Sequence, residues 1–276
     1  MKSIGRGTLI MLCALALAGV LGPPAQAGRG DGPRAGASII GGKKADFAQW
    51  PFAASIFLKG KFHCSGAVIA PTKVLTAAHC LDGFNVAKLA VITGRFKLTN
   101  RAVGESFAAA AAAPHPDYHR MQIHDVGVIT LDHPTASPPV SLPTPEEGAT
   151  FGYAGQTMRV AGWGARNPFG FKLSKILRSA TDQVRTDRRC RRAYRKLYTV
   201  PAMMCASGRR LKKFGKNPAI HETACAGDSG APLVADLPRG PVVIGTVSFG
   251  GLFCGLASEP TVYSRVSDSL AFLTTA

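Results

Sequence analysis

The chain has 276 residues, of which 46% are apolar and 18% are charged. This composition supplies a sizeable core, in one large domain or two small ones, and excludes a wholly disordered chain. The formal net charge of +17 is strongly basic, which favours either a solvated charged face or contact with anionic partners.

The first 27 residues have the features of a secretory signal. Two basic residues flank the start of the chain, an apolar stretch covers 8–22, and Ala-Gln-Ala at 25–27 offers small residues to signal peptidase. A membrane anchor is the alternative, but the stretch is shorter than the roughly 20 residues that span a bilayer. We therefore expect residues 1–27 to be removed during export, to the periplasm or the cell exterior. No later stretch of the sequence is long and apolar enough to span a membrane.

Residues 28–38 are rich in Gly, Ala and Arg and are predicted to form a flexible pro-segment. From 39 to 276, short apolar runs rich in Val, Ile and Thr alternate with turn residues, which is typical of an all-β domain. Short helices are expected at 188–197 and 268–274, and the Pro-rich segment 134–145 would join two β halves. The expected strands are 51–58, 67–69, 74–77, 89–93, 126–131, 158–162, 241–248 and 261–266.

An alanine run at 108–113 gives conflicting signals. Alanine has the highest helix propensity, so the run alone favours a helix. Pro114 and Pro116 follow at once, and the neighbouring segments are expected strands. We therefore expect an extended segment here.

The cysteines indicate disulfides. Cys13 would leave with the signal, and the six that remain would enter an oxidising compartment. Zinc is the competing use, but no CxxC or comparable ligand cluster supports it. The sequence alone allows 15 pairings. The six are Cys64, Cys80, Cys190, Cys205, Cys225 and Cys254.

Three segments carry residues suited to nucleophilic catalysis. His79 stands in TAAHC, Asp125 opens the apolar run DVGVITL, and Ser229 lies in GDSGAP. A serine hydroxyl needs a base to take its proton, and a carboxylate holds that histidine in the required tautomer. Gly227 leaves room for backbone N–H groups to reach a developing oxyanion.

The order of these residues separates the classes of serine hydrolase. An α/β-hydrolase places its histidine after the serine, but the last histidine here is His221. A subtilisin-like order needs an acid before the histidine. Asp46 precedes His79, but the β-rich pattern disfavours that α/β fold. The order His79, Asp125, Ser229 fits the arrangement of chymotrypsin.

These motifs closely resemble those of the chymotrypsin–trypsin family of serine proteases (peptidase family S1), over about 39–274. The sequence IIGG at 39–42 resembles the family's mature N-terminus, and AGWG at 161–164 resembles one of its turns. The resemblance implies an all-β fold of two six-stranded antiparallel barrels with the active site in the cleft between them. The barrels would occupy roughly 39–140 and 141–266, followed by a short C-terminal helix.

The resemblance also implies a disulfide pairing and a mode of activation. The pairs would be Cys64–Cys80, Cys190–Cys205 and Cys225–Cys254. Cleavage before Ile39 would free an α-amine that pairs with Asp228 and orders the oxyanion hole, which the N–H groups of Gly227 and Ser229 would form. Ser38 precedes the cleaved bond, so trypsin is not the expected activating protease.

By the same resemblance, four residues would shape the S1 pocket. Thr223 would lie at its base, where trypsin-like members have Asp, and Ala224 would stand beside it. Gly250 would leave the mouth open, and the β-branched Thr261 would shorten the pocket. We therefore expect a preference for small or medium uncharged P1 residues.

No metal or cofactor is expected. The segment 95–105, where the family's calcium loop would fall, has a single acid, and Ca²⁺ needs several oxygen ligands. His115, His119 and His124 are interpreted as part of a surface loop. Two basic runs, 185–196 and 209–216, form either a solvated face or an exosite for an anionic polymer.

These observations predict a secreted, monomeric serine endopeptidase made as a zymogen. A catalytically inert cationic binding protein on the same fold is the alternative, since such a protein could bind anionic polymers through the basic runs. Loss of His79, Asp125 or Ser229 would mark that class, and all three residues are present.

Overall fold

A computed structural model of the protein describes residues 39–118, 123–170, 172–211 and 220–276. The expected signal and pro-segment lie outside the described residues, as does most of the basic run 209–216. No helix in these ranges is long and apolar enough to cross a membrane.

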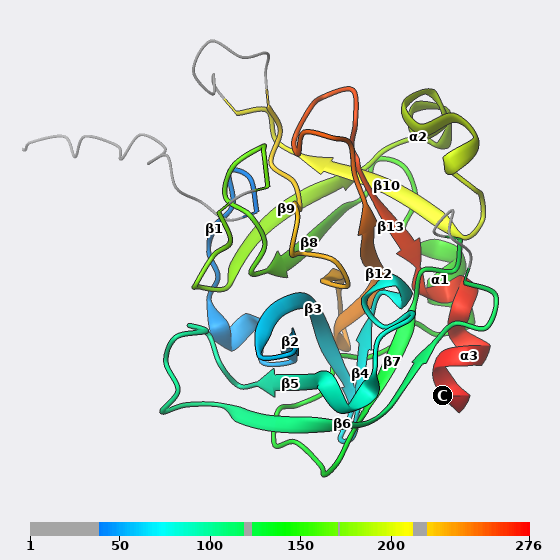
Figure 1. Ribbon diagram of the computed structural model, residues 1–276. Coiled ribbons are helices and arrows are strands. Elements are labelled where there is room, and N and C mark those ends of the chain that lie inside the picture. Colours follow the sequence, from blue (N-terminus) through cyan, green and yellow to red (C-terminus); the bar gives the residue numbers. More distant parts are fainter. Residues whose placement is uncertain (1–38, 119–122, 171, 212–219) are drawn as a thin grey trace, which may run out of the picture. The chain divides into compact units, whose positions relative to one another are not determined.

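The first half of the described chain forms a closed antiparallel barrel, which lies in the lower part of Figure 1. Its strands follow the order β2-β3-β4-β7-β6-β5 around the barrel. They are β2 (Ala53–Leu58), β3 (Lys61–Ala70), β4 (Lys73–Thr76), β5 (Leu89–Thr93), β6 (Glu105–Pro114) and β7 (Gly127–Leu131).

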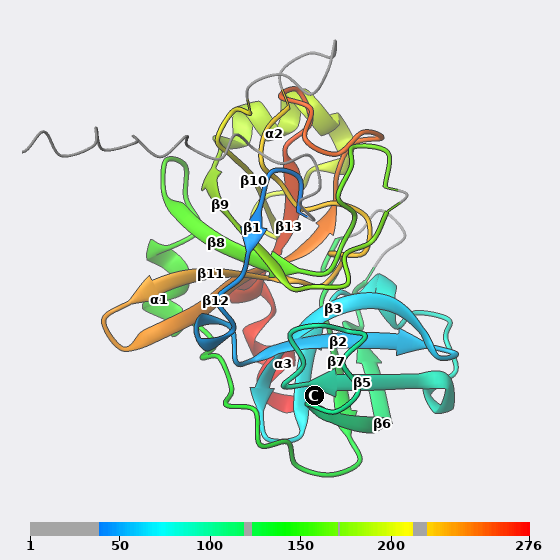
Figure 2. The same ribbon diagram turned by 90° about the vertical axis from the view of Figure 1, so that its left-hand side faces the viewer.

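The second half forms another closed barrel, in the order β9-β10-β13-β12-β11-β8 with β8 paired to β9. Figure 2 shows the short strand β1 (Lys43–Lys44) beside this barrel, where it pairs with β9. The barrel strands are β8 (Thr157–Gly162), β9 (Arg178–Val184), β10 (Met203–Gly208), β11 (Pro232–Leu237), β12 (Gly240–Phe249) and β13 (Thr261–Arg265). With the C-terminal helix α3 (Leu270–Thr275), this arrangement confirms the predicted fold class.

Helices are short and few in the described part of the chain. The predicted helix at 188–197 forms α2 (Asp187–Tyr194) and η4 (Arg195–Leu197), and the one at 268–274 forms η5 (Val266–Ser269) and α3. The sequence did not predict the other helices. They are α1 (Pro145–Thr150), η1 (Phe47–Gln49), η2 (Ala78–Cys80) and η3 (Val86–Lys88).

In the alanine run at 108–113, strand pairing outweighs the helix propensity of alanine. The run lies in β6, where Ala108 pairs with Ala90 of β5 and Ala112 pairs with Ile129 of β7. Hydrogen bonds to strands on both sides outweigh the few tenths of a kcal/mol per residue by which alanine favours a helix over other residues. The expectation of an extended segment is confirmed.

Three disulfides join the pairs that the family resemblance implies. Cys64–Cys80 connects β3 to η2, with 6.3 Å between the Cα atoms. Cys190–Cys205 fixes α2 to β10, with 5.9 Å between the Cα atoms. Cys225–Cys254 joins the loop before Ser229 to the loop after β12.

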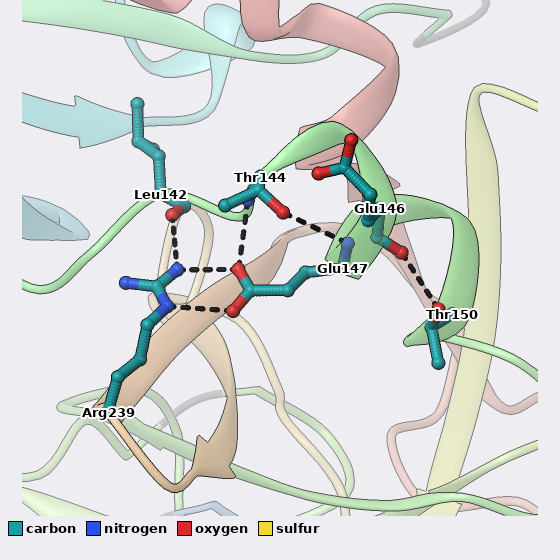
Figure 3. Close-up of polar contacts among 6 residues, drawn as sticks. All are labelled: Leu142, Thr144, Glu146, Glu147, Thr150 and Arg239. Atoms are coloured by element: carbon teal, nitrogen blue, oxygen red, sulfur yellow. Dashed lines mark hydrogen bonds and ion pairs between the residues drawn. The ribbon is translucent and has the colours of Figure 1, made fainter.

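Helix α1 lies in the connection between the barrels and is anchored to the second of them (Figure 3). A capping box begins the helix, because Thr144 Oγ1 accepts from Glu147 N and the Glu147 carboxylate accepts from Thr144 N. Arg239, which precedes β12, donates to both oxygens of Glu147 and to Leu142 O. This bidentate contact lowers the pKa of Glu147 to about 2.

We expect Thr144→Ala to lower the free energy of unfolding by about 1 kcal/mol, because Glu147 N loses its side-chain acceptor. Thr150→Ala is the matched control, since the Thr150 hydroxyl donates to Glu146 O near the end of the same helix and caps nothing. Urea unfolding of the two variants measures the difference. Equal losses in both variants would contradict a capping role for Thr144.

Candidate active site

His79 and Asp125 are held together by two contacts within the first barrel. His79 lies in η2 directly after β4, and Asp125 lies just before β7, the strand that pairs with β4. The Asp125 carboxylate accepts from His79 N at 2.9 Å, and its other oxygen lies 2.7 Å from His79 Nδ1. With Nδ1–H directed at the carboxylate, Nε2 of the ring carries the lone pair that a general base needs.

A residue of the second barrel completes the surroundings of Asp125. Ser248, near the end of β12, donates its hydroxyl to Asp125 Oδ2 at 2.6 Å. The carboxylate is fully buried and accepts three hydrogen bonds, so its orientation is fixed from both barrels. The His79 side chain is 26% exposed, which leaves part of its ring accessible from the cleft.

Ser229 comes from the second barrel and lies in a turn pressed against the first. Its carbonyl accepts from Ser65 N of β3 at 2.9 Å, and Ser65 Oγ donates to Gly227 O at 3.2 Å. Gly230 N donates to Val247 O, which ties the turn to β12. These contacts bring the Ser229 turn to the strands that precede His79.

Gly230 is the residue that permits this approach. It has a φ of +76°, which a residue with a side chain rarely adopts. A Cβ atom there would lie 2.5 Å from Ser65 O and 2.8 Å from Ala77 N, two residues before His79. A larger residue would therefore separate Ser229 from the histidine.

Two backbone donors beside Ser229 are available to a ligand. Within 39–118, 123–170, 172–211 and 220–276, the N–H groups of Gly227 and Ser229 have no hydrogen-bond acceptor. Gly227 has a φ of +90°. Paired N–H groups next to a nucleophile suit the negative oxygen of a tetrahedral intermediate.

Asp228 is a fully buried carboxylate behind this turn. It accepts from Gly164 N at 2.8 Å and from Cys225 N at 3.0 Å. Side chains at Gly162 or Gly164 would overlap its carboxylate, which explains the glycines on both sides of Trp163. Burial raises the pKa of Asp228 to about 7, and no cation of the described chain pairs with it.

The segment expected to become the mature N-terminus is packed in the second barrel. Ile39 and Ile40 are fully buried, and Ile39 belongs to the same apolar cluster as Ala224 and Ala231. Ile40 and Thr223 exchange two backbone hydrogen bonds, at 2.9 and 3.2 Å. Ile39 is thus held close in the fold to the loop that carries Asp228.

A cavity of about 240 Å³ opens beside Ser229. Ala224, Gly250 and Thr261, three of the four residues assigned to the S1 pocket by resemblance, line it. Thr223 does not line it, because it is buried behind Thr261, with the two hydroxyl oxygens 2.5 Å apart. Thr261 therefore lies between Thr223 and the cavity.

One group of side chains in the described residues has metal-like spacing. It contains His63, Cys64 and Cys80, but both sulfurs belong to a disulfide and are not thiolate ligands. Among the three loop histidines, His115 and His124 stack with 4.8 Å between ring centroids, and His119 lies outside the described residues. His124 Nδ1 lies 3.3 Å from an Asp268 oxygen.

Sequence reasoning missed two acids and one hydroxyl near this site. Ser248-Phe249-Gly250 resembles the family's substrate-binding strand, but nothing in the sequence indicated that the Ser248 hydroxyl would bind Asp125. Asp182 could have been noticed, because it occupies an inward position of β9 between the buried Ala180 and Val184. Glu259, in the wall of the cavity, had no signal in the sequence.

Comparisons with known proteins agree with this geometry. A family model described as Trypsin matches residues 39–273. A trypsin from Saccharopolyspora erythraea is 32% identical over 231 residues, covering 83% of this chain and 93% of its own length. Kallikrein 1-related peptidase b24 from Mus musculus is 28% identical, covering 94% and 93%. Serine protease 57 from Rattus norvegicus is 29% identical, covering 98% and 90%.

The buried Asp182 gives a test of pH dependence. Burial raises its pKa to about 7, although Tyr263 donates to its Oδ2 at 2.7 Å. The folded state therefore holds a proton that the unfolded chain loses near pH 4, so we expect stability to fall as pH rises from about 4 to 7. Asp182→Asn, which keeps the acceptor for Tyr263, should reduce this slope in urea unfolding measured across that range, and the part that remains comes from Asp228, whose pKa is raised in the same way.

Asp82→Asn, at an exposed position, is the matched control for the loss of one carboxylate. It should leave the slope between pH 4 and 7 in place. A slope that survives Asp182→Asn in full would contradict a proton held on Asp182.

Proposed function

Because this chain belongs to the trypsin family of serine proteases, we propose that it cleaves polypeptides with Ser229 as nucleophile, His79 as general base and Asp125 as the orienting carboxylate. The observation that carries this proposal is the Asp125 carboxylate, which fixes the His79 ring through Nδ1 while the Ser229 turn packs against the same segment. The coarser function, serine endopeptidase, follows from the family itself.

In the proposed reaction, Ser229 Oγ attacks the substrate carbonyl while His79 Nε2 takes its proton. The N–H groups of Gly227 and Ser229 stabilise the oxyanion, and one such donor is typically worth about 3–4 kcal/mol in the transition state. His79 then gives the proton to the leaving amine, which leaves an acyl-enzyme on Ser229. Water, activated by the same histidine, releases the acid and restores the hydroxyl.

For specificity, we propose small or medium uncharged P1 residues. Thr261 lines the cavity, and its hydroxyl is already engaged with Thr223. Neither threonine offers a carboxylate to an Arg or Lys side chain, and the one carboxylate among the described residues of the lining, that of Glu259, lies against Gly251. Gly250 adds no side chain at the entrance, so the width of the cavity is set by the backbone there.

For activation, we propose export followed by cleavage before Ile39, in the periplasm or outside the cell. The freed α-amine would supply the cation that the buried Asp228 lacks among the described residues. A buried carboxylate gains strongly from such a partner, so the ion pair would hold the turn of Gly227 and Ser229 in its binding arrangement.

The alternative, a catalytically inert cationic binding protein, gains no support from the site. Such a protein has no need of the contacts that orient His79, yet Asp125 accepts three hydrogen bonds around it. We therefore keep proteolysis as the function.

Covalent labelling tests the proposal directly. A protein with a specific protease site placed directly before Ile39 should react with a fluorophosphonate only after cleavage, and then hydrolyse peptide libraries. Ser229→Ala, processed in the same way, should do neither. Absence of labelling in correctly processed, folded protein would overturn the proposed function.

The P1 proposal is tested with the same libraries. We expect wild-type cleavage after small and medium uncharged residues, and Thr261→Gly should raise kcat/KM for Phe or Tyr at P1 by about tenfold, since a larger apolar pocket gains 1–3 kcal/mol of binding. Thr246→Ser, a change in β12 away from the cavity, is the control. A wild-type profile dominated by Arg or Lys would contradict the proposal.

A further inference from the structure

Helix α2 carries a group of arginines whose charge is not neutralised. Arg188, Arg189, Arg191 and Arg192 are exposed, and no acidic side chain of the described residues forms an ion pair with any of them. The one acid of the helix, Asp187, accepts from the Tyr198 hydroxyl at 2.6 Å instead. The positive charge of α2 is therefore directed at solvent.

Part of this charge lines a groove. Arg188, Arg189 and Arg192 contribute to a cavity of about 480 Å³ between α2 and residues 257–259, whereas Arg191 does not. Arg189 Nη2 donates to Ala257 O at 2.8 Å, so the helix is hydrogen-bonded to the opposite wall of the groove.

Two further contacts hold the groove in a fixed shape. Tyr194 donates to Pro260 O at 2.6 Å, which joins the end of α2 to the segment before β13. The disulfide Cys190–Cys205 fixes the middle of α2 to β10. Guanidinium groups held on a rigid frame lose less entropy when they bind an anion.

The groove is adjacent to the cavity beside Ser229, because Glu259 lines both. Its side chain lies against Gly251, at the far end of the cavity wall formed by 247–251. Glu259 Oε2 is buried and has no hydrogen-bond donor among the described residues. A ligand that occupies both the cavity and the groove would pass beside Glu259.

These features together select one kind of ligand. Guanidinium groups bind carboxylates through paired N–H donors. A polypeptide with acidic side chains supplies such carboxylates, and it is also the substrate of the adjoining site. A polyanion with a phosphate or sulfate on every unit would place negative charge against Glu259 as it entered.

We propose that the groove between α2 and residues 257–259 extends the substrate site and binds acidic side chains of the polypeptide that is being cleaved. This inference rests on the proposed function. It assigns Arg188 and Arg192 to substrate selection, and it gives the basic run 185–196 a partner of defined chemistry. The preference for acidic side chains therefore concerns substrate residues other than the P1 residue, which the cavity beside Ser229 would hold.

The test uses processed protein and two sets of fluorogenic peptides that share the same residues around the cleaved bond. One set carries a Glu-Glu block beyond those residues, at either end of the peptide, and the other carries Gln-Gln. We expect kcat/KM to be roughly fivefold to tenfold higher for Glu-Glu at one end, as two carboxylate–guanidinium contacts allow. The preference should shrink as salt is raised.

The variant Arg188→Gln/Arg192→Gln should abolish this preference. The matched control Arg191→Gln/Arg195→Gln removes the same charge from exposed positions outside the groove and should retain it. Both variants should cleave a short peptide without the block at the wild-type rate. Equal loss of preference in the two variants, or no preference in the wild type, overturns the inference.

The two levels of the proposal fail in different ways. No hydrolysis of the short peptide and no fluorophosphonate labelling would refute the proposed function. Normal cleavage of the short peptide with no response to Glu-Glu would refute the groove alone. A heparin fragment that binds through Arg188 and Arg192, without any preference for acidic peptides, would also overturn it and assign the groove to a polysaccharide.

Discussion

The hydrogen bonds between the two barrels are the constraint on which the candidate site depends. Ser65 N of the first barrel donates to Ser229 O, and Ser248 Oγ of the second barrel donates to Asp125 Oδ2. Each barrel therefore positions a candidate catalytic residue of the other barrel. Neither barrel contains the full set of residues, and a small shift between them would separate Ser229 from His79. The close approach at Gly230 shows how little room for such a shift the packing leaves.

The sequence predicted the fold well where local patterns were strong. The run 89–93 became β5 without change, and those at 126–131 and 261–266 differ from β7 and β13 by a single residue at one end. It missed β9 and β10, because their segments mix polar and small residues and their pairing is settled by distant strands. Thr144 and Glu147 have the spacing of a capping box, but no apolar run follows them, so the sequence did not predict α1.

The sequence predicted those residues of the site that lie in recognisable motifs. His79, Asp125 and Ser229 stood in recognisable segments, and the structure brings their segments together. Residues that act through position had no such signal. Thr223 was expected in the pocket, yet it lies behind Thr261, because only the three-dimensional path of β13 decides which threonine faces the cavity.

In the second barrel, two aspartate side chains are buried and the arginines of α2 are exposed. The proposed activation involves the buried aspartates, and the proposed selection of substrates involves the exposed arginines. Asp182 and Asp228 are fully buried, where an ionised carboxylate without a partner is unfavourable. An α-amine freed at Ile39 would already lie in this interior, because Ile39 is fully buried, and it would neutralise one of them, whereas the arginines of α2 lie at the surface. The arginines are exposed and remain hydrated, and from this position they attract an approaching acidic chain at long range. The proposed activation therefore depends on the lack of cations inside the barrel, and the proposed selection of acidic substrates depends on their excess outside it.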